Sequence, residues 1–348
     1  MTALWSLLAD LPLTVGHVES EQLSAAYTEM TRVTTIIRLV GLDGQDGLGE
    51  EIGGPERTPH DQLAELVPTL PLAGEWTLGS FCAHVGAMDL WPEPPEWELA
   101  RNFRRWAFES AALDLALRQD GRSLGQALGR SPAPVRFVSS FGLGDPPTLD
   151  GVHRRLDADA TLRFKVDAER TWPRPLMEEL AATGAVATID FKGQYGLPVG
   201  TAEEMAALYD GVLACFPDAL LEDPHDLPGI GEKLRAVRER VSYDAPVTSV
   251  ESLSSLPVEP GWVNVKPSRI GSLQTLFAIY AHCDAAGLPM YGGGMGELGV
   301  GRRQVQLLAS LFHPDGPNDV APSDYNLADL PDHLPRSPLV LREQHGFR

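Results

Sequence analysis

Basic residues are scarce in this chain relative to acidic ones. The 348 residues include 28 lysines and arginines against 48 aspartates and glutamates, which gives a formal net charge of −20 at pH 7. Proteins that bind nucleic acid need clustered lysines and arginines to contact phosphates. The charge balance therefore argues against a nucleic-acid partner, and an acidic excess of this kind mainly favours solubility.

Long apolar runs and paired cysteines are missing as well. No apolar run approaches the ~18 residues of a membrane-spanning helix, and residues 1–15 lack the basic flank and cleavage site of a secretion signal. We therefore expect no membrane span and a cytoplasmic protein. The cysteines, Cys82, Cys215 and Cys283, have no metal-binding or redox spacing. Their odd number, without a Cys-x-x-Cys pair, predicts buried thiols in a reducing compartment.

The first third of the chain mixes strand and helix signals. Thr31–Leu42 (TRVTTIIRLVGL) has the composition of a strand, and a turn at residues 43–47 follows it, so we expect a hairpin. Arg101–Gly129 carries apolar residues at helical spacing, with Gly121 and Gly129 as expected helix ends. A small α+β portion is therefore predicted first.

The pattern changes at about Val135. From there short apolar strands alternate with helical segments, and about seven such units fit before Pro314. This alternation favours a parallel sheet joined by right-handed connections, as in an α/β barrel. The residues from Pro314 to Arg348 show little periodicity, and we expect them to wrap back over the first portion.

Five polar residues stand near the ends of apolar runs, 22 to 32 positions apart: Lys165, Asp190, Glu222, Asp244 and Lys266. In a (β/α) barrel, side chains at the C-terminal ends of the strands converge on one mouth. Three carboxylates there suit Mg²⁺, and a partly desolvated lysine near a metal has a lowered pKa and can act as a base. A lone aspartate after a strand is commonly a helix cap and a lone lysine a solvated charge. The ordered set favours a metal-assisted acid/base site.

These residues resemble a known family, the enolase superfamily, in its muconate-lactonizing-enzyme-like branch. Thr31–Glu51 is similar to the strand, Asp-Gly turn and Gly-x-Gly-Glu ending of the family's capping domain, and the segment FESAALDLALRQDGRSLGQALG is similar to its alanine-rich helix. In the barrel half, Asp190, Glu222 and Asp244 match the three Mg²⁺ ligands, Lys165 matches the acid/base lysine of the Lys-x-Lys motif, Lys266 matches the opposing lysine, and Glu297 in YGGGMGELGVGR matches a glutamate near the end of the barrel.

The resemblance implies a fold and a first chemical step. The expected fold is α/β: an N-terminal α+β capping domain (1–110), a modified TIM (β/α) barrel (111–315), and a tail (316–348) that packs back on the capping domain. In the expected step, Mg²⁺ coordinates the carboxylate of a small-molecule substrate, a lysine removes the α-proton, and the metal stabilises the enediolate. The family often forms homo-oligomers, so an oligomer stays open here.

Three positions depart from the family pattern. Arg163 replaces the first lysine of Lys-x-Lys, and we expect it to raise the local positive potential. Lys192 adds an ammonium two residues beyond Asp190, and strand alternation places the two on one face. We expect Lys192 to bind a substrate anion or pair with a ligand carboxylate, with an ordinary loop lysine as the alternative. Ala245 replaces a glutamate after Asp244, which removes a carboxylate that would support the metal ligands.

The choice of reaction depends on fewer residues. The segment Lys266–Leu273 (KPSRIGSL) is similar to o-succinylbenzoate synthases, and Arg269 is similar to an arginine of N-succinylamino-acid racemases. The Asp-x-Asp element of dipeptide epimerases is absent from YGGGMGELG, which argues against dipeptide epimerisation. No histidine follows the third ligand as in the mandelate-racemase branch, and His282 lies in an apparent helix.

A syn-dehydration like that of o-succinylbenzoate synthase is therefore the leading interpretation, with Lys165 as the base and Lys266 stabilising the anionic intermediate. The alternative is an N-acylamino-acid racemase, or another cycloisomerase or lyase of the superfamily, with Lys165 and Lys266 acting on opposite faces. A third alternative, of another class, is a metal-poor binding relative in which Lys192 takes the charge role of Mg²⁺.

Several other features are expected around the pocket. Ser20–Met30 occupies the place of the family's capping loop and is short, with Tyr27 and Met30 as candidate substrate contacts. Gly293 permits close approach of the backbone at a strand end. Ser139, with Ser140 beside it, is expected to point at the mouth from the first barrel strand.

Overall fold

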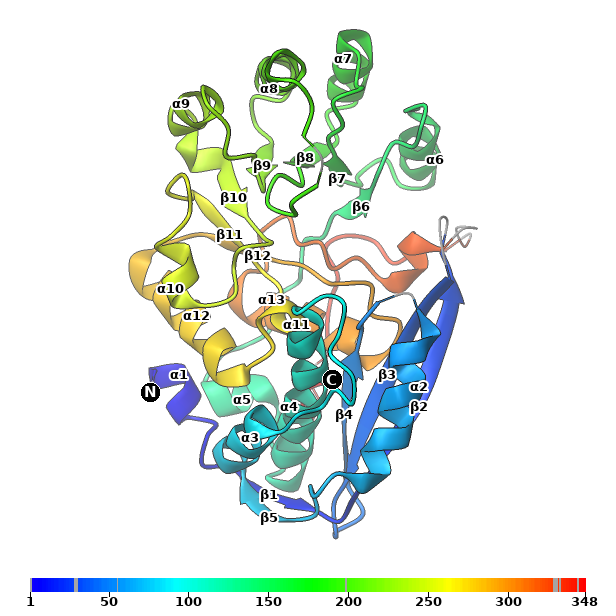
Figure 1. Ribbon diagram of the computed structural model, residues 1–348, viewed down its shortest axis with the longest axis vertical. Helices are drawn as coiled ribbons and strands as arrows, with labels where there is room; N and C mark the ends of the chain where they lie inside the picture. The colour runs from blue at the N-terminus through cyan, green and yellow to red at the C-terminus, as the bar shows by residue number, and fades with distance from the viewer. Residues whose placement is uncertain are drawn as a thin grey trace.

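The computed structural model describes residues 2–27, 31–54, 56–197, 199–327, 331, 333–342 and 344–348. Within these residues the strands form a seven-stranded parallel sheet, a three-stranded antiparallel sheet and a two-stranded antiparallel sheet. In Figure 1 helices α6 to α9 and the strands β6 to β10 occupy the upper part, and the antiparallel sheets lie below. The expected α/β architecture is confirmed. No helix in this part of the chain is both long and apolar enough to span a bilayer.

The three-stranded sheet contains the expected hairpin. Strands β3 (Thr31–Val40) and β4 (Asp46–Glu51) pair antiparallel across the turn at Gly44, whose φ of 78° favours glycine. Strand β2 (His17–Ala26) pairs with the other edge of β3. The expectation of a loop from Ser20 is therefore wrong as far as Ala26, because these residues complete the sheet; residues 28–30 lie outside the described residues.

The rest of the capping portion consists of short elements and one long helix. Helix α4 (Ala100–Gln119) packs directly on β4, since a Cβ at Gly47 would lie 2.2 Å from the Ala111 carbonyl oxygen and one at Gly49 2.0 Å from that of Ala107. The predicted helix breaks are confirmed, because α4 ends before Gly121 and α5 ends before Gly129, which caps it. The other elements are α1 (Ala3–Ser6), β1 (Pro12–Val15), α2 (Arg57–Leu66), η1 (Val67–Thr69), β5 (Gly74–Thr77), α3 (Leu78–Ala87) and α5 (Leu124–Leu128).

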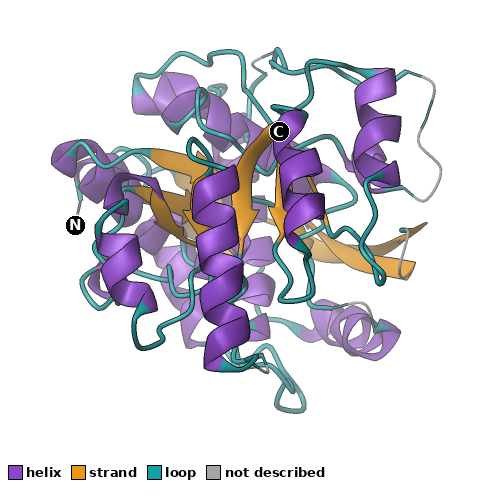
Figure 2. Ribbon diagram, turned by 90° about the horizontal axis from the view of Figure 1, so that it is seen from above, coloured by secondary structure: helices purple, strands orange, loops and turns teal. Residues whose placement is uncertain are grey.

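The parallel sheet follows the order of the chain, as expected for about seven βα units. Its strands are β6 (Ser139–Phe141), β7 (Phe164–Asp167), β8 (Val186–Asp190), β9 (Leu220–Glu222), β10 (Val241–Tyr243), β11 (Trp262–Val265) and β12 (Met290–Gly292). The helices around it are α6 (Asp150–Ala158), α7 (Arg174–Ala182), α8 (Ala202–Cys215), α9 (Ile230–Arg235), η2 (Arg238–Arg240), α10 (Val250–Leu253), α11 (Pro267–Ile270), α12 (Leu273–Ala286) and α13 (Val300–Phe312). Figure 2 shows helices around the strands of this sheet.

A short segment after α13 links the two ends of the sheet. Asn318 forms a parallel bridge with Phe137, just before β6, and Asp319 forms one with Gly293, just after β12. The Val138 amide donates to the Asn318 carbonyl at 2.8 Å, and the Asp319 amide donates to the Gly292 carbonyl at 2.7 Å. Asn318 and Asp319 thereby close the curled sheet between its first strand, β6, and its last strand, β12.

The end of the chain contacts both the barrel and the capping portion. After η3 (Ser323–Asn326), Leu339 exchanges backbone hydrogen bonds with Val135 at 2.7 and 2.9 Å. Phe347 is fully buried and packs edge-on against Trp106 of α4, with ring centroids 6.1 Å apart. Figure 1 shows the C-terminus beside α4.

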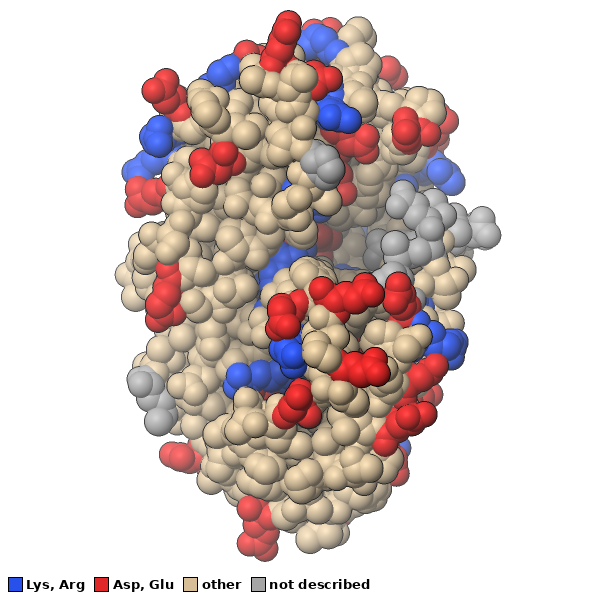
Figure 3. Space-filling view, viewed as in Figure 1, with Lys and Arg blue, Asp and Glu red and all other residues tan. Residues whose placement is uncertain are grey.

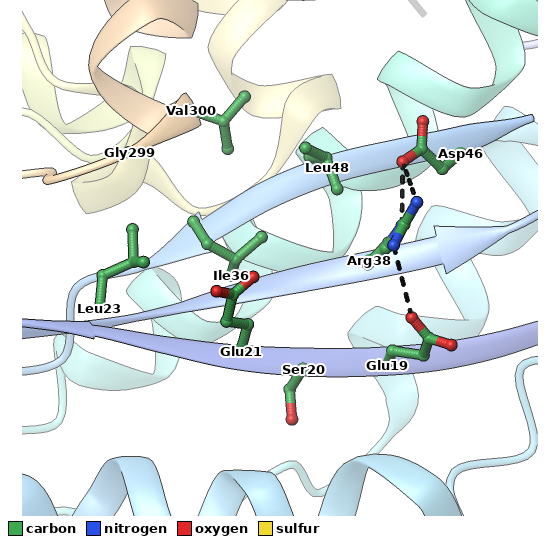
Figure 4. Close-up of a pocket in the computed structure, with 10 residues that line it drawn as sticks. All are labelled: Glu19, Ser20, Glu21, Leu23, Ile36, Arg38, Asp46, Leu48, Gly299 and Val300. Atoms are coloured by element: carbon green, nitrogen blue, oxygen red, sulfur yellow. Dashed lines mark hydrogen bonds and ion pairs between the residues drawn. The ribbon is translucent and has the colours of Figure 1, made fainter.

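A pocket of about 410 Å³ lies on the face of the three-stranded sheet that meets the start of α13. Figure 4 shows its apolar floor, which includes Leu23, Leu48 and Val300, and its charged rim, where Arg38 pairs with Asp46 at 2.9 Å. It contains none of the predicted site residues, so the candidate site is elsewhere.

Candidate active site

The five residues singled out in the sequence lie at or near the C-terminal ends of consecutive strands. Lys165 is in β7, Asp190 and Glu222 end β8 and β9, and Asp244 and Lys266 directly follow β10 and β11. Asp190 pairs in register with Glu222. All five are at most 5% exposed, so the parallel strands bring the predicted residues together in a buried cluster.

Lys165 lies between two of the carboxylates. Its ammonium donates a short hydrogen bond to Glu222, lies 3.0 Å from Asp190 Oδ2, and is 3.7 Å from Asp319 Oδ2. Burial lowers the pKa of Lys165, but the charges of Asp190 and Glu222 outweigh it and raise the pKa well above its ordinary value. The ammonium form is therefore favoured while the acids have no other cation.

Glu222 is fully buried, like Asp190 and Asp244. Burial, together with the charges of Asp190 and Asp244, raises the pKa of Glu222 to about 7, although Lys165 acts in the opposite direction. The Tyr291 hydroxyl donates to its Oε2 at 2.5 Å. The side-chain amide of Asn264 donates to its Oε1 at 3.3 Å.

Asp244 is bound by a second set of cations. Lys266 Nζ lies 2.8 Å from its Oδ2, Arg269 Nη1 lies 2.6 Å from its Oδ1, and the Tyr195 hydroxyl donates to Oδ2 at 3.1 Å. Burial raises the pKa of Asp244, but the charges of Arg269 and Lys266 bring it well below its usual range. Arg269, which the sequence predicted either to contact substrate or to support the metal ligands, thus contacts a predicted metal ligand and also donates to Tyr195 at 2.9 Å.

Lys192 contacts Asp190, one of the roles that the sequence left open for it. Its ammonium donates to Asp190 Oδ2 at 2.5 Å and lies 3.2 Å from Asp167 Oδ1, and its backbone amide donates to Asp190 Oδ1 at 3.0 Å. The strand-alternation argument does not apply, because β8 ends at Asp190 and Lys192 has a left-handed φ of 53°. A turn rather than a strand brings the two side chains together.

Gly293 and Glu297 flank this cluster. A Cβ at Gly293 would lie 2.3 Å from Lys266 Cε, so glycine makes room for that lysine, as expected for close approach. Glu297 is buried, accepts the Met295 amide at 2.8 Å and pairs with Arg302 at 3.2 Å. These contacts of Glu297 hold the loop after β12.

Three other expected residues lie at other positions in the fold. Arg163 precedes β7, and its guanidinium donates to the carbonyls of Ala185 and Val186, each at 3.1 Å. Ser139 is buried at the start of β6, and its hydroxyl has no hydrogen-bond partner among the described residues. Tyr27 forms an isolated bridge with Leu327. Met30 lies outside the described residues.

Asp223 is a member of the site that the sequence reasoning missed. One oxygen each from Asp190, Glu222 and Asp223 lies within 4.8 Å of the others, and all three residues are buried. Both oxygens of Asp223 accept backbone amides, from Asp244 at 2.7 Å and from Ala245 at 2.9 Å. Burial and the charges of Asp244 and Glu222 raise the pKa of Asp223 to about 8. The signal was its position beside Glu222 in the run DALLEDP.

The donor atoms fit a hard divalent cation. The grouped ligand atoms are all carboxylate oxygens, which Mg²⁺ prefers. Six carboxylates and four basic side chains meet in this region, and the raised pKa values of Glu222 and Asp223 reflect their burial and the surplus of acids. The acids are Asp167, Asp190, Glu222, Asp223, Asp244 and Asp319, and the bases are Lys165, Lys192, Lys266 and Arg269. Figure 3 shows a hollow between the barrel helices and the capping portion, with basic side chains visible inside it.

Comparisons of sequence place the chain among known proteins. The models of the N-terminal and C-terminal domains of a family described as "Domain of unknown function (DUF8230)" match residues 6–127 and 131–327. The chain is 30% identical over 226 residues to an N-succinylamino acid racemase of Amycolatopsis sp. The aligned region covers 63% of this chain and 60% of the relative. It is 28% identical over 300 residues to an N-succinylamino acid racemase of Thermus thermophilus, which covers 83% and 78%. An o-succinylbenzoate synthase of Geobacillus kaustophilus is 25% identical over 233 residues, which covers 64% and 60%.

Solved structures have the same fold. A muconate cycloisomerase from Pseudomonas fluorescens superposes with a TM-score of 0.70 at 16% identity, covering 97% of this chain and 96% of that one. A dipeptide epimerase from Methylococcus capsulatus, in complex with Mg and the dipeptide L-Arg-D-Lys, gives a TM-score of 0.70 at 19% identity and covers 96% and 99%. The chain therefore belongs to the family described as domain of unknown function DUF8230, and its fold is that of the enolase superfamily.

Proposed function

We propose that this protein removes the α-proton of a small carboxylate substrate, with Lys165 as the base and Mg²⁺ as the cofactor. The observation that carries the proposal is the position of Lys165, whose ammonium is buried between Asp190 and Glu222 near the C-terminal ends of the barrel strands. A base beside a cation site at this end of a barrel is suited to proton abstraction next to a carboxylate.

The chain's own residues divide the work. Asp190, Glu222 and Asp244 are the proposed metal ligands, as the sequence pattern predicts. Asp223, whose carboxylate lies close to those of Asp190 and Glu222, also positions Asp244 by accepting its backbone amide. When bound, magnesium would offset the negative charge that develops on the substrate carboxylate. It would also coordinate the acids that pair with Lys165 in this structure. Lys165 then holds the abstracted proton, while Lys266 supplies a second ammonium across the site.

The first candidate reaction is a dehydration like that of o-succinylbenzoate synthase. The electron pair of the broken C–H bond forms a carbon–carbon double bond, the C–O bond breaks, and the leaving hydroxide takes the proton from Lys165 to depart as water. The Geobacillus relative and the KPSRIGSL segment support this candidate. In it, Lys266 stabilises negative charge without moving a proton.

The second candidate is racemisation of an N-acylamino acid. It is favoured by the burial of Lys266 against Asp244, which gives the site a second positioned proton carrier. The racemases of Amycolatopsis and Thermus also have higher identity to this chain than the synthase does. In this reaction one lysine removes the proton and the other returns a proton to the opposite face, so both are essential.

The test is exchange of the substrate α-proton for deuterium in D₂O, followed by NMR with N-succinylamino acids and with the cyclohexadiene precursor of o-succinylbenzoate. We expect exchange or turnover that requires Mg²⁺ and falls by roughly 100-fold or more in Lys165→Ala, the size typical of a lost acid/base group. If the reaction is racemisation, Lys266→Ala also abolishes it. If the reaction is dehydration, Lys266→Ala retains the proton exchange that Lys165 catalyses.

A surface control and a metal titration complete the experiment. Lys233→Ala, at a lysine paired with Asp210 away from the site, should leave the rates unchanged. Absence of Mg²⁺ binding at millimolar concentrations, with no exchange on any substrate, would instead support the binding-protein alternative.

A further inference from the structure

A row of acids crosses the edge of the sheet beside the proposed metal site. Asp167, Asp190 and Glu222 are in register on the adjacent strands β7, β8 and β9, as the pairs Asp167–Asp190 and Asp190–Glu222 show. Carboxylates in direct register repel one another unless cations lie between them. Asp167 has no place in the proton-transfer scheme, so its partner needs a separate explanation.

Two lysines neutralise this row. Lys165 lies between Asp190 and Glu222, and Lys192 lies between Asp167 and Asp190, at 3.2 and 2.5 Å. Both ammonium groups approach the same oxygen, Asp190 Oδ2. A divalent cation that binds Asp190 therefore competes with Lys192 as well as with the base.

The backbone presents Lys192 to Asp190. Its φ of 53° is in the left-handed region, which is energetically costly for a residue other than glycine. The following turn is fixed, because a Cβ at Gly193 would lie 2.4 Å from the His225 amide and the Gln194 side chain donates to the Pro224 carbonyl at 2.5 Å. The turn thus places both the amide and the ammonium of Lys192 on one carboxylate.

A second carboxylate, that of Asp167, lies within ion-pair distance of Lys192. The Asp167 carboxylate is about one-third exposed and already lies within ion-pair distance, so the ammonium needs only a small movement to leave Asp190 for Asp167. The Lys192 side chain is itself 32% exposed, against 1% for Lys165 and 6% for Lys266. Among these lysines it has the most room to move.

We propose that Lys192 is a built-in competitor for the divalent cation: it occupies Asp190 when no ion is bound and transfers to Asp167 when the ion binds. This inference depends on the proposed metal site. It makes Lys192 a positioning residue that sets the affinity for the cation, with Asp167 as its alternative partner.

The experiment is a calorimetric titration of the full-length protein with Mg²⁺, repeated with Mn²⁺. Lys192→Gln should bind the ion roughly tenfold more tightly or better, since it removes a unit charge a few ångströms from the ligand. Asp167→Asn should bind it several-fold more weakly, because Lys192 is then left with Asp190 alone. Lys192→Arg, which keeps the charge, should stay closer to the parent than the glutamine variant.

The double variant Lys192→Gln/Asp167→Asn separates transfer of the lysine from simple charge effects. If Asp167 acts through Lys192, adding Asp167→Asn to Lys192→Gln changes the affinity little. An unchanged or weakened affinity in Lys192→Gln overturns the proposal, and so does an undiminished effect of Asp167→Asn in the double variant. Lys233→Gln is the matched charge control, and thermal unfolding checks that each variant is folded.

The outcomes also separate this inference from the function beneath it. If no variant binds either ion, the metal site itself is refuted. If all bind with equal affinity, the metal site stands and only the role of Lys192 falls.

Discussion

The buried Glu222 carboxylate depends on its hydrogen-bond donors as well as on cations. Tyr291 is fully buried, and its hydroxyl donates to Glu222 Oε2 at 2.5 Å and lies 2.8 Å from Ser242 Oγ. A hydrogen bond to a charged group contributes more than one between neutral groups, and a buried acceptor left without a donor is costly.

We therefore expect Tyr291→Phe to lower the free energy of unfolding by about 2 kcal/mol in urea denaturation. Tyr280→Phe is the matched control, because the hydroxyl of this buried tyrosine is 3.4 Å from a neutral group, His313, and its loss should cost less than about 1 kcal/mol. Equal losses in the two variants would show that the Glu222 contact has no special weight.

The contacts of individual side chains were harder to predict than the set they belong to. The spacing of Lys165, Asp190 and Glu222 was enough to place them together, because parallel strands align their C-terminal ends. Lys192 was assigned by strand alternation, which failed because β8 ends at Asp190 and a left-handed turn follows. Asp223 was missed because an acid at the end of a strand resembles a helix cap until its two backbone partners are seen.

At the scale of elements, the segment that closes the barrel is held by a buried histidine. His313 Nδ1 lies 2.7 Å from Asn318 Oδ1, and the Asn318 side chain also accepts the Gly292 amide at 2.7 Å. Burial lowers the pKa of His313 to about 4, although the hydrogen bond to Asn318 acts in the opposite direction. The folded protein therefore favours the neutral ring.

This shift predicts a loss of stability in acid. Between pH 6.5, the ordinary value for histidine, and about pH 4, the unfolded chain takes up a proton that the folded chain refuses. The contribution of His313 is complete above pH 6.5 and falls by about 3 kcal/mol as the pH drops through this window. Urea unfolding at pH 7.5, 5.5 and 4.5 measures it.

Carboxylates titrate in the same pH range, so the pH dependence of the parent's stability must be compared with that of the variant His313→Gln. This variant retains a side-chain amide that can donate to Asn318 but does not titrate, and its stability should depend less steeply on pH than that of the parent. Parallel pH profiles for the two proteins would contradict the assignment to His313.

The succession of elements was largely readable from the sequence, since apolar periodicity and glycine stops reflect local backbone preferences. The hairpin of β3 and β4 and the breaks at Gly121 and Gly129 are examples. The stretch from Ser20 to Ala26 could not be assigned from the sequence, because its strand β2 has no fully buried residue and is defined by pairing with β3. Closure by Asn318 and Asp319 was equally hidden, because single bridges leave no periodic pattern.

At the scale of the whole molecule, residues 346–348 connect the C-terminal tail to helix α4. The Phe347 amide donates to Asp114 Oδ1 at 2.7 Å, and Gly346 exchanges backbone hydrogen bonds with Arg122 and Leu124. Arg348 pairs with Asp114 at 3.2 Å and with Asp46 at 2.7 Å. The C-terminal residues thereby neutralise a buried acid on α4 and contact β4, the strand that α4 covers.

Phe347→Ala should therefore destabilise the protein far more than its position next to the chain end implies. The ring is fully buried against Trp106, and truncation of a buried phenylalanine costs about 3–5 kcal/mol. Urea unfolding followed by tryptophan fluorescence measures the loss, because Trp106 reports on this contact. Val340→Ala, at a side chain that is 72% exposed in the same tail, should change the free energy of unfolding by less than about 0.5 kcal/mol. A similarly small effect for Phe347→Ala would mean that α4 and the barrel keep their core without the tail, and that the C-terminal contacts do not contribute to folding.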